Sequence, residues 1–129
     1  MALIVDERRY DIPRTEACTP GEARSIRYSV REKTNGVFAA ATSFAAYSDW
    51  EFYLYDKLGD GGLDQTARQA AAIFYVEAAS FTLSAPYATV PMTEAQTALV
   101  NPGMRAHELW VKIGGAWSRI SYGDVPFVT

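Results

Sequence analysis

The amino-acid sequence predicts a small all-β protein, built as a single β-sandwich of the immunoglobulin-like or jelly-roll-like kind. Three observations support this prediction. The chain has 129 residues, which suits one domain with a sizeable core. Apolar side chains recur at every second position in several short segments, as they do in half-buried strands. Glycine, proline and asparagine turn signals separate these segments, and such spacing is typical of sandwiches and small barrels.

Residues 1–20 are predicted to form an extended N-terminal arm, and residues 21–129 the β-sandwich domain. The arm combines a short apolar strip with a patch of mixed charge and ends at a Pro-Gly turn signal. Its apolar side chains would anchor it either on its own domain or on another subunit, and the sequence leaves both open. These candidate partner-binding anchors are Leu3, Ile4, Val5, Tyr10 and Ile12.

Two segments in the first half of the domain alternate clearly. Residues 26–30 place Ile, Tyr and Val on one side of a predicted strand and Arg and Ser on the other. Residues 50–55 predict a second strand with large rings on both faces. Between them, residues 34–36 indicate a turn. Residues 37–46 are rich in alanine and show no clear period, so no element is assigned to them.

The middle of the chain is divided by loops. Residues 59–62 are a glycine-rich loop that no regular element would tolerate. Residues 63–72 have helical propensity but a poor apolar stripe, which leaves a short helical turn or part of a long loop. Residues 73–76, 81–83 and 87–90 are enriched in aromatic and β-branched side chains, so they are predicted as short strands.

The C-terminal third has the clearest pattern. Residues 93–96 have the Thr-x-x-Gln form of a capping box and predict one turn of helix. Residues 105–113 alternate along a strand, and the two glycines that follow favour a tight hairpin. Residues 117–122 return as the partner strand. Residues 125–128 either continue that strand or add an edge strand, where their proline is tolerated.

Charge and composition argue against several function classes. The hydrophobic share of 49% and the charged share of 21% are those of an ordinary globular protein. The net charge is −3 and the basic residues are scattered, so we expect no nucleic-acid partner. The apolar run over residues 1–5 is too short for a membrane span or a secretory segment, so we expect no membrane contact. Cys18 is the only cysteine, which excludes an intrachain disulfide and fits cytoplasmic synthesis.

No metal site is predicted. One histidine and one cysteine do not supply the ligands of structural zinc. Asp56, Asp60 and Asp64 surround the glycine-rich loop, but they recur at every fourth position and not at the alternate positions of a calcium-binding loop. A polar loop is the favoured interpretation of these three carboxylates, and cation binding there stays open.

No catalytic set and no cofactor are predicted either. Asp49 and Glu51 flank Trp50 and share a strand face, which is the arrangement that a glycosidase or lectin-like site would need. Nucleophilic catalysis would require Cys18 or a serine to meet His107. His107 lies on the apolar face of its strand, so a buried core or interface histidine is favoured.

Aromatic rings are the best candidates for surface chemistry. The eight tyrosines and three tryptophans exceed what a modest core obviously needs, and both residue types are enriched at protein interfaces. Tyr53 and Tyr55 lie opposite the Trp50 face, and Trp110 lies opposite the face of Leu109. These three rings are predicted to bind a partner, with burial an equal alternative for the tyrosines. A carbohydrate-binding module that stacks Trp50 or Trp110 on a sugar is a more distant alternative.

The C-terminal third contains a series of short motifs: Asn101-Pro102-Gly103, Glu108-Leu109-Trp110-Val111, Gly114-Gly115, Arg119-Ile120 and Tyr122-Gly123-Asp124-Val125. An N-terminal counterpart is Pro20-Gly21-Glu22, which leads into the first alternating strand. Together these motifs resemble the closing hairpin of immunoglobulin-like modules in virion proteins of tailed bacteriophages.

The resemblance implies a non-enzymatic structural role in the virion. Its partner would be the major capsid protein or another virion protein, and the chain would act as a homo-oligomer or in many copies. One module with a short arm suits a capsid decoration, or cement, protein that bridges capsid subunits through the arm and the sandwich surface. A tail, neck or baseplate adaptor is the alternative.

Overall fold

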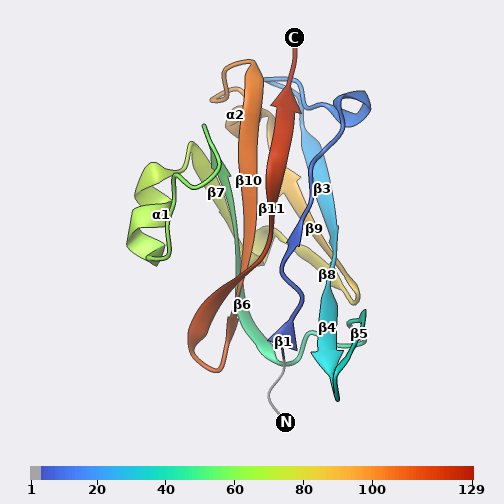
Figure 1. The fold of residues 1–129 in the computed structure, drawn as a ribbon. Coiled ribbons are helices and arrows are strands. Elements are labelled where there is room, and N and C mark those ends of the chain that lie inside the picture. Colours follow the sequence, from blue (N-terminus) through green and yellow to red (C-terminus); the bar gives the residue numbers. More distant parts are fainter. Residues whose placement is uncertain (1–3) are drawn as a thin grey trace.

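The computed structural model describes residues 4–129 and shows an all-β sandwich with two short helices (Figure 1). The predicted fold class is therefore confirmed. Single 3-10 turns occupy Arg14–Glu16 and Ala78–Ser80. The helices are α1 (Gln65–Ala71) and α2 (Glu94–Thr97). The strands are β1 (Ile4–Val5), β2 (Arg8–Arg9), β3 (Arg24–Ser29), β4 (Arg31–Thr34), β5 (Val37–Ala40), β6 (Tyr47–Tyr55), β7 (Phe74–Glu77), β8 (Thr82–Ser84), β9 (Tyr87–Met92), β10 (Gly103–Ile113) and β11 (Ala116–Phe127).

The strands form three sheets. The main sheet has the order β2-β11-β10-β6-β7, and the small sheet has the order β3-β9-β8. A tip sheet, β1-β4-β5, lies at the end of the molecule opposite α2 and the C-terminus (Figure 1). β3 and β4 are separated only by Val30, so one nearly continuous strand passes from the small sheet into the tip sheet.

The hydrophobic core lies between the main sheet and the small sheet. Alternation supplies it from both sides, because every second side chain of a strand faces the opposite layer. The small sheet contributes Ile26, Tyr28, Val30, Ala88, Val90 and Met92, and the main sheet contributes Trp50, Phe52, Leu54, Phe74, Val76, Leu109, Val111, Ile120, Val125 and Phe127. Burial of this apolar surface is the main driving force for the fold.

The β10–β11 hairpin forms the centre of the main sheet. It pairs from Gly103↔Phe127 to Ile113↔Ala116 in antiparallel register, with one irregularity beside Leu109. Gly114 and Gly115 form its turn with φ of 57° and 82°, a region that side chains disfavour. The predicted hairpin is confirmed, and residues 125–127 continue β11 as one of the two predicted alternatives.

Most other predicted elements also form. Residues 26–29 of the first alternating segment fall in β3, residues 50–55 fall in β6, and residues 63–72 contain α1. The capping box is present at α2, where Thr93 Oγ1 accepts from the Gln96 backbone and the Gln96 side chain accepts from the Thr93 backbone. Residues 37–40, which the sequence left without an element, form β5 with every side chain exposed.

The segment predicted as an arm is extended, and most of it is hydrogen-bonded to β11 at the edge of the main sheet. β2 pairs with β11 in parallel register. Beyond it, the backbone of Tyr10 donates to Tyr122 O at 2.7 Å and that of Ile12 donates to Asp124 O at 2.8 Å. Cys18 N donates to Pro126 O at 2.9 Å. Figure 1 shows this segment climbing between β11 and β3. Of the two anchoring options, packing on its own domain is what the structure has.

The anchors themselves are placed as follows. Val5 and Tyr10 are half-buried against the core, and Ile12 is buried. Ile4 pairs with Lys33 through the backbone of β1. Leu3 lies outside the described residues.

Gly123 is what allows the arm to lie so close to β11. A β-carbon built on Gly123 would stand 2.1 Å from the carbonyl oxygen of Tyr10 and 2.9 Å from Oδ1 of Asp11. Real β-carbons do not approach backbone atoms this closely, so any side chain here would push the arm away. The φ of Gly123 is not in the left-handed region, so its backbone conformation does not demand glycine. The lack of space for a β-carbon is what requires glycine at this position.

We predict that Gly123→Ala lowers the free energy of unfolding by about 3 kcal/mol, because the displaced arm strands a buried carbonyl as well as straining the sheet. Urea denaturation would measure the loss, and limited proteolysis would show cleavage within residues 6–18. Ser118→Ala, an exposed change on the same strand, should leave both unchanged. A fully stable Gly123→Ala protein with a protected arm would contradict this role.

Candidate functional site

The three rings predicted to form a binding surface are buried. Tyr53 and Tyr55 are 0% exposed and Trp110 is 4% exposed, so the prediction that they present a partner-binding surface is wrong. They form an outer-face cluster with Ala106, on the side of the main sheet away from the core. The segment over residues 56–72, which contains α1, covers them (Figure 1). The sequence left burial of Tyr53 and Tyr55 as an equally favoured alternative, and the structure shows that burial.

A buried arginine holds this cover in place. Arg68 on α1 is 0% exposed, and its guanidinium lies 3.7 Å from the ring centre of Trp110 and 5.3 Å from that of Tyr53. Its Nη1 donates to Leu63 O at 2.6 Å. Asp64 caps the start of α1 by accepting from the backbone of Ala67. Cation–π stacking in a desolvated site adds to the packing of the cover.

The carboxylates next to this cluster are already occupied as hydrogen-bond acceptors. Glu51 accepts from Gln65 and Gln69 at 3.0 Å each and from the hydroxyl of Tyr53. Burial and this bond raise the pKa of Tyr53. Trp50 is 2% exposed in the core, so it offers no ring for a sugar. The geometry does not support the lectin-like site considered around Trp50.

The three aspartates of the glycine-rich loop perform separate tasks. Asp56 accepts from Arg105 at 3.4 Å. Asp60 accepts from the backbone of Lys57 at 3.1 Å, and Asp64 caps α1. Across residues 4–129, no three His, Cys, Asp or Glu side chains gather in a way that could hold a metal ion. In the same residues, no helix is long and apolar enough to cross a membrane.

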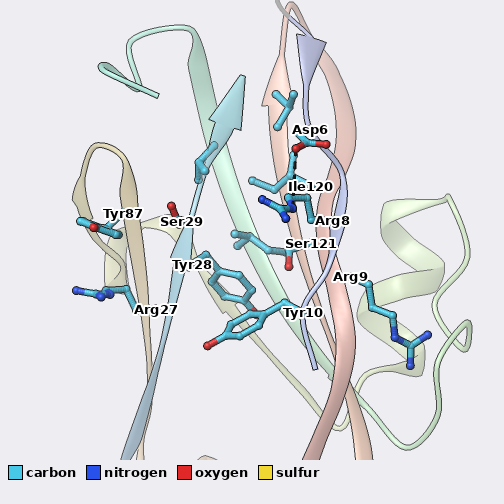
Figure 2. A pocket seen from close by; sticks show the side chains of 13 residues that line it. Asp6, Arg8, Arg9, Tyr10, Arg27, Tyr28, Ser29, Tyr87, Ile120 and Ser121 are labelled. Carbon is cyan, nitrogen blue, oxygen red and sulfur yellow. Dashed lines mark ion pairs between the residues drawn. The ribbon is translucent and has the colours of Figure 1, made fainter. Parts of the chain in front are cut away.

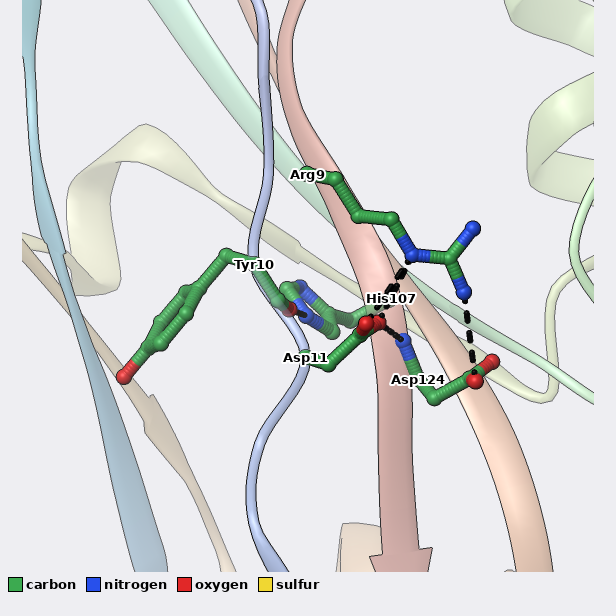
Figure 3. Close-up of polar contacts among 5 residues, drawn as sticks. All are labelled: Arg9, Tyr10, Asp11, His107 and Asp124. Carbon is green, nitrogen blue, oxygen red and sulfur yellow. Dashed lines mark hydrogen bonds and ion pairs between the residues drawn. The ribbon is translucent and has the colours of Figure 1, made fainter.

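His107 is buried as predicted, and it connects three parts of the fold. The hydroxyl of Tyr28 on β3 lies 2.6 Å from His107 Nδ1. The carbonyl oxygen of Tyr10 lies 2.6 Å from His107 Nε2 (Figure 3). A carbonyl only accepts, so Nε2 carries the proton and the neutral ring accepts from Tyr28 at Nδ1. Both nitrogens are engaged, and neither is free to activate Cys18 or a serine.

Burial sets the protonation state of this ring. Loss of hydration lowers the pKa of His107 to about 4, although the Tyr10 carbonyl and the nearby carboxylates of Asp11 and Asp124 favour the charged form. Asp11 in turn accepts from the backbone of Asp124 at 2.9 Å, and that bond together with Arg9 lowers the pKa of Asp11. The imidazole is therefore neutral at physiological pH.

A seam opens between the arm and β3. We define the seam as the groove between residues 5–18 and β3, and the half-buried Tyr10 divides it into two cavities. The first cavity has a volume of about 350 Å³, in the range of ligand sites, and Tyr28, Val30, Leu109 and Ile120 form its apolar lining (Figure 2). The second, of about 250 Å³, continues past Tyr10 to Cys18 and Ile26.

Arginines line the open side of the seam. Arg8, Arg24 and Arg27 border the two cavities against the carboxylates of Asp6 and Glu16, whereas the neighbouring Arg9 is paired with Asp11 and Asp124. Arg27 stacks on the exposed ring of Tyr87, with its guanidinium carbon 4.3 Å from the ring centre. This local excess of positive charge stands out on a chain of net charge −3.

The tip sheet presents the most continuous exposed apolar segment. All four residues of β5 are exposed, with Val37 at 66% and Phe38 at 40%. β5 is also the outer strand of its sheet, so among residues 4–129 no strand pairs with its second backbone edge. Lys33 on β4 places its ammonium 5.2 Å from the ring centre of Phe38. The sequence showed this segment only as an alanine-rich stretch without period.

Comparison with protein-family models, curated proteins and solved structures found no match to this chain.

We predict that stability falls by about 2 kcal/mol between pH 7 and pH 5 because of His107. Its pKa is lower in the folded state, so the unfolded chain binds more protons between its ordinary pKa of about 6.5 and the folded value of about 4. The contribution is thus fully present above pH 6.5 and is lost as pH falls.

Urea unfolding at several pH values would measure this dependence, with His107→Gln as the comparison. The variant should be less stable at pH 7, because it cannot reproduce both hydrogen bonds. Between pH 7 and pH 5 it should show the smaller change that the carboxylates alone produce. Equal pH dependence in both proteins would mean that His107 is not the titrating group.

Proposed function

We propose that this chain is a non-enzymatic structural protein of a tailed-bacteriophage virion, and that it decorates the capsid as a cement protein. The observation that carries the proposal is β5, a strand that exposes Val, Phe and two Ala side chains together with an open backbone edge. Folded proteins normally protect such edges with charges, proline or a covering loop. β5 has none of these on its own strand. A partner that adds a strand and covers the apolar side chains would remove this liability.

In this proposal only the first residues of the arm contribute to docking, whereas the sequence predicted that the whole arm would contribute. Residues 8–18 are engaged by β11, so they are not available to clamp a neighbouring subunit. The start of the arm instead forms β1, which pairs with β4 and completes the tip sheet. In this proposal the tip sheet is the docking element and the remainder of the arm holds it in position.

The size of the tip fits attachment in many copies. Stable pairwise interfaces bury roughly 1,200–2,000 Å², which four strand residues cannot supply alone. A weak contact repeated over an assembled shell still stabilises it by mass action. The same tip would suit a tail, neck or baseplate adaptor, and the position of the chain on the particle distinguishes these alternatives. Particle proteomics and electron cryomicroscopy would locate it.

We predict that the double variant Val37→Lys with Phe38→Glu, which preserves net charge, lowers the number of particle-bound copies about tenfold or more. Each change replaces a side chain whose burial is worth about 1.5–3 kcal/mol. Gradient-purified particles mixed with the purified chain and analysed by quantitative mass spectrometry would give the copy number.

Leu99→Glu serves as the matched control, because Leu99 is 62% exposed and follows α2, a helix that lies at the end of the molecule away from β5 (Figure 1). It should bind particles like the wild type. If the double variant, shown to be folded by circular dichroism, binds at full occupancy, the tip is not the docking element.

A second candidate function, carbohydrate binding, is favoured by one specific cleft. A cavity of about 370 Å³ on the outer side of the main sheet is bordered by the half-buried ring of Trp117. Beside it, Glu108 accepts from Trp110 Nε1 at 2.9 Å and from Arg119 at 3.0 Å. Glu108 is 2% exposed and both its oxygens are occupied, so the groups that could stack on and hydrogen-bond a sugar are the ring of Trp117 and the partly exposed guanidinium of Arg119.

If this cleft binds glycans, a glycan array should give signals that Trp117→Ala removes, because the stacking face is lost. Tyr75→Ala, which removes an exposed ring elsewhere on the main sheet, should keep them. An array without signals for the wild-type protein would exclude this candidate and leave the virion proposal unaffected.

A further inference from the structure

We propose that the seam is a receptor for an extended acidic segment of a partner protein, which adds to the open edge of β3 as an extra strand. The inference rests on the proposed docking function and deepens it by naming the chemistry of a second contact. Three features support it: unpaired backbone groups on β3, cavities beneath that edge, and arginines along it.

The hydrogen-bond register shows which backbone groups are open. Val30 N donates to Pro86 O at 2.8 Å, so Val30 and the residues at even spacing from it direct their N–H and C=O groups toward β9. Ser25, Arg27 and Ser29 therefore direct theirs to the opposite edge. In the described part of the chain, no hydrogen bond uses the N–H of any of these three residues.

The tip sheet already shows a strand on this same edge. Asp6 N donates to Arg31 O at 2.9 Å, continuing the pairing of β1 with β4. Arg31 is at even spacing from Ser29 and Arg27, so its carbonyl marks the edge that they share. After Asp6 the chain leaves this edge and crosses to β11 as β2. The hydrogen-bond ladder that β1 begins thus stops at Arg31, beside the Ser29 end of β3. The β3 edge beyond this point has no partner strand in the described residues, and it borders the seam.

The cavities lie where an added strand would place side chains. A strand beside β3 would direct alternate side chains toward the core, and on that side lie the cavities of about 350 Å³ and 250 Å³. Tyr10 separates them, so two inward side chains would straddle its ring. The apolar lining from Val30, Leu109 and Ile120 favours aliphatic or aromatic side chains in the larger cavity.

The charges select an acidic occupant. Arg27 has no carboxylate within 4 Å in the described residues, and Arg24 donates to the backbone oxygen of Glu16 at 2.8 Å. Arg8 has only a distant contact of 3.9 Å with Asp6. Carboxylates on the outward positions of an added strand would meet these guanidinium groups. A nucleic-acid strand has phosphates but no row of N–H and C=O groups to complete the ladder.

The test uses the full chain and two synthetic peptides of about seven residues. One alternates glutamate with leucine, and the other replaces each glutamate with lysine. The acidic peptide should shift the amide NMR signals of Ser25, Arg27 and Ser29 and bind more weakly as salt is raised. The basic peptide should bind at least about tenfold more weakly.

Variants separate the backbone contribution from the charge contribution. Ser29→Pro removes an N–H that no described residue uses, so it should preserve the fold and weaken the acidic peptide about tenfold relative to Ser29→Ala. Arg27→Glu should weaken it at least as much. Lys57→Glu, the same charge change on an exposed loop, should have little effect. If Ser29→Pro does not fold, the effect of Arg27→Glu and the salt dependence of binding still test whether the acidic peptide binds at the seam.

Absence of acidic-peptide binding, equal binding of both peptides, or signal shifts confined to β5 would each overturn the seam proposal. The tip variant Val37→Lys with Phe38→Glu should bind the acidic peptide like the wild type, because it leaves the β3 edge intact. A failed peptide experiment would therefore leave particle attachment through the tip standing, and a failed particle experiment would leave the peptide result standing.

Discussion

The imidazole of His107 is the group on which the arrangement of the arm and both sheets depends. It projects from β10 into the core side of the main sheet, accepts from Tyr28 of the small sheet and donates to the carbonyl of Tyr10 in the arm. A carbonyl left unpaired at this depth would cost about 1–3 kcal/mol. The neutral ring satisfies the carbonyl without placing a charge in the core. With Gly123 leaving space on β11, this bond sets how closely the arm approaches and therefore how the seam opens.

The elements that the sequence predicts well are those whose signal is local. Alternation over residues 26–30 and 105–113 reports burial on one face of a strand, and the capping box at Thr93 joins atoms three residues apart. The prediction of a buried core or interface histidine at His107 rests on the same kind of signal, because its neighbours on that strand face are apolar. For these features each local choice agrees with the final fold.

The features that the sequence missed depend on distant contacts. Tyr53, Tyr55 and Trp110 alternate as an exposed face would, and only the folding of residues 56–72 over them, with Arg68 against Trp110, makes that face interior. The arm pairs in parallel with β11, more than 100 positions away in the chain, as the 112-residue separation of Glu7 and Arg119 illustrates. β5 has no period because every one of its side chains is exposed, so burial imposes no pattern on it.

Among the outer strands of the described sheets, β3 and β5 differ in their side chains, and these side chains would admit different partners. β3 carries Arg24 and Arg27, and arginines facing each other in a symmetric pairing of two copies would repel. This edge thus disfavours self-association, and in the seam proposal it would accept carboxylates. β5 carries no charge, so it lacks one of the usual protections against pairing, and in the docking proposal a partner would cover it. A protein that binds an acidic strand at one edge and an apolar surface at the other can connect two different neighbours. Bridging of neighbouring subunits is the property that a cement protein requires.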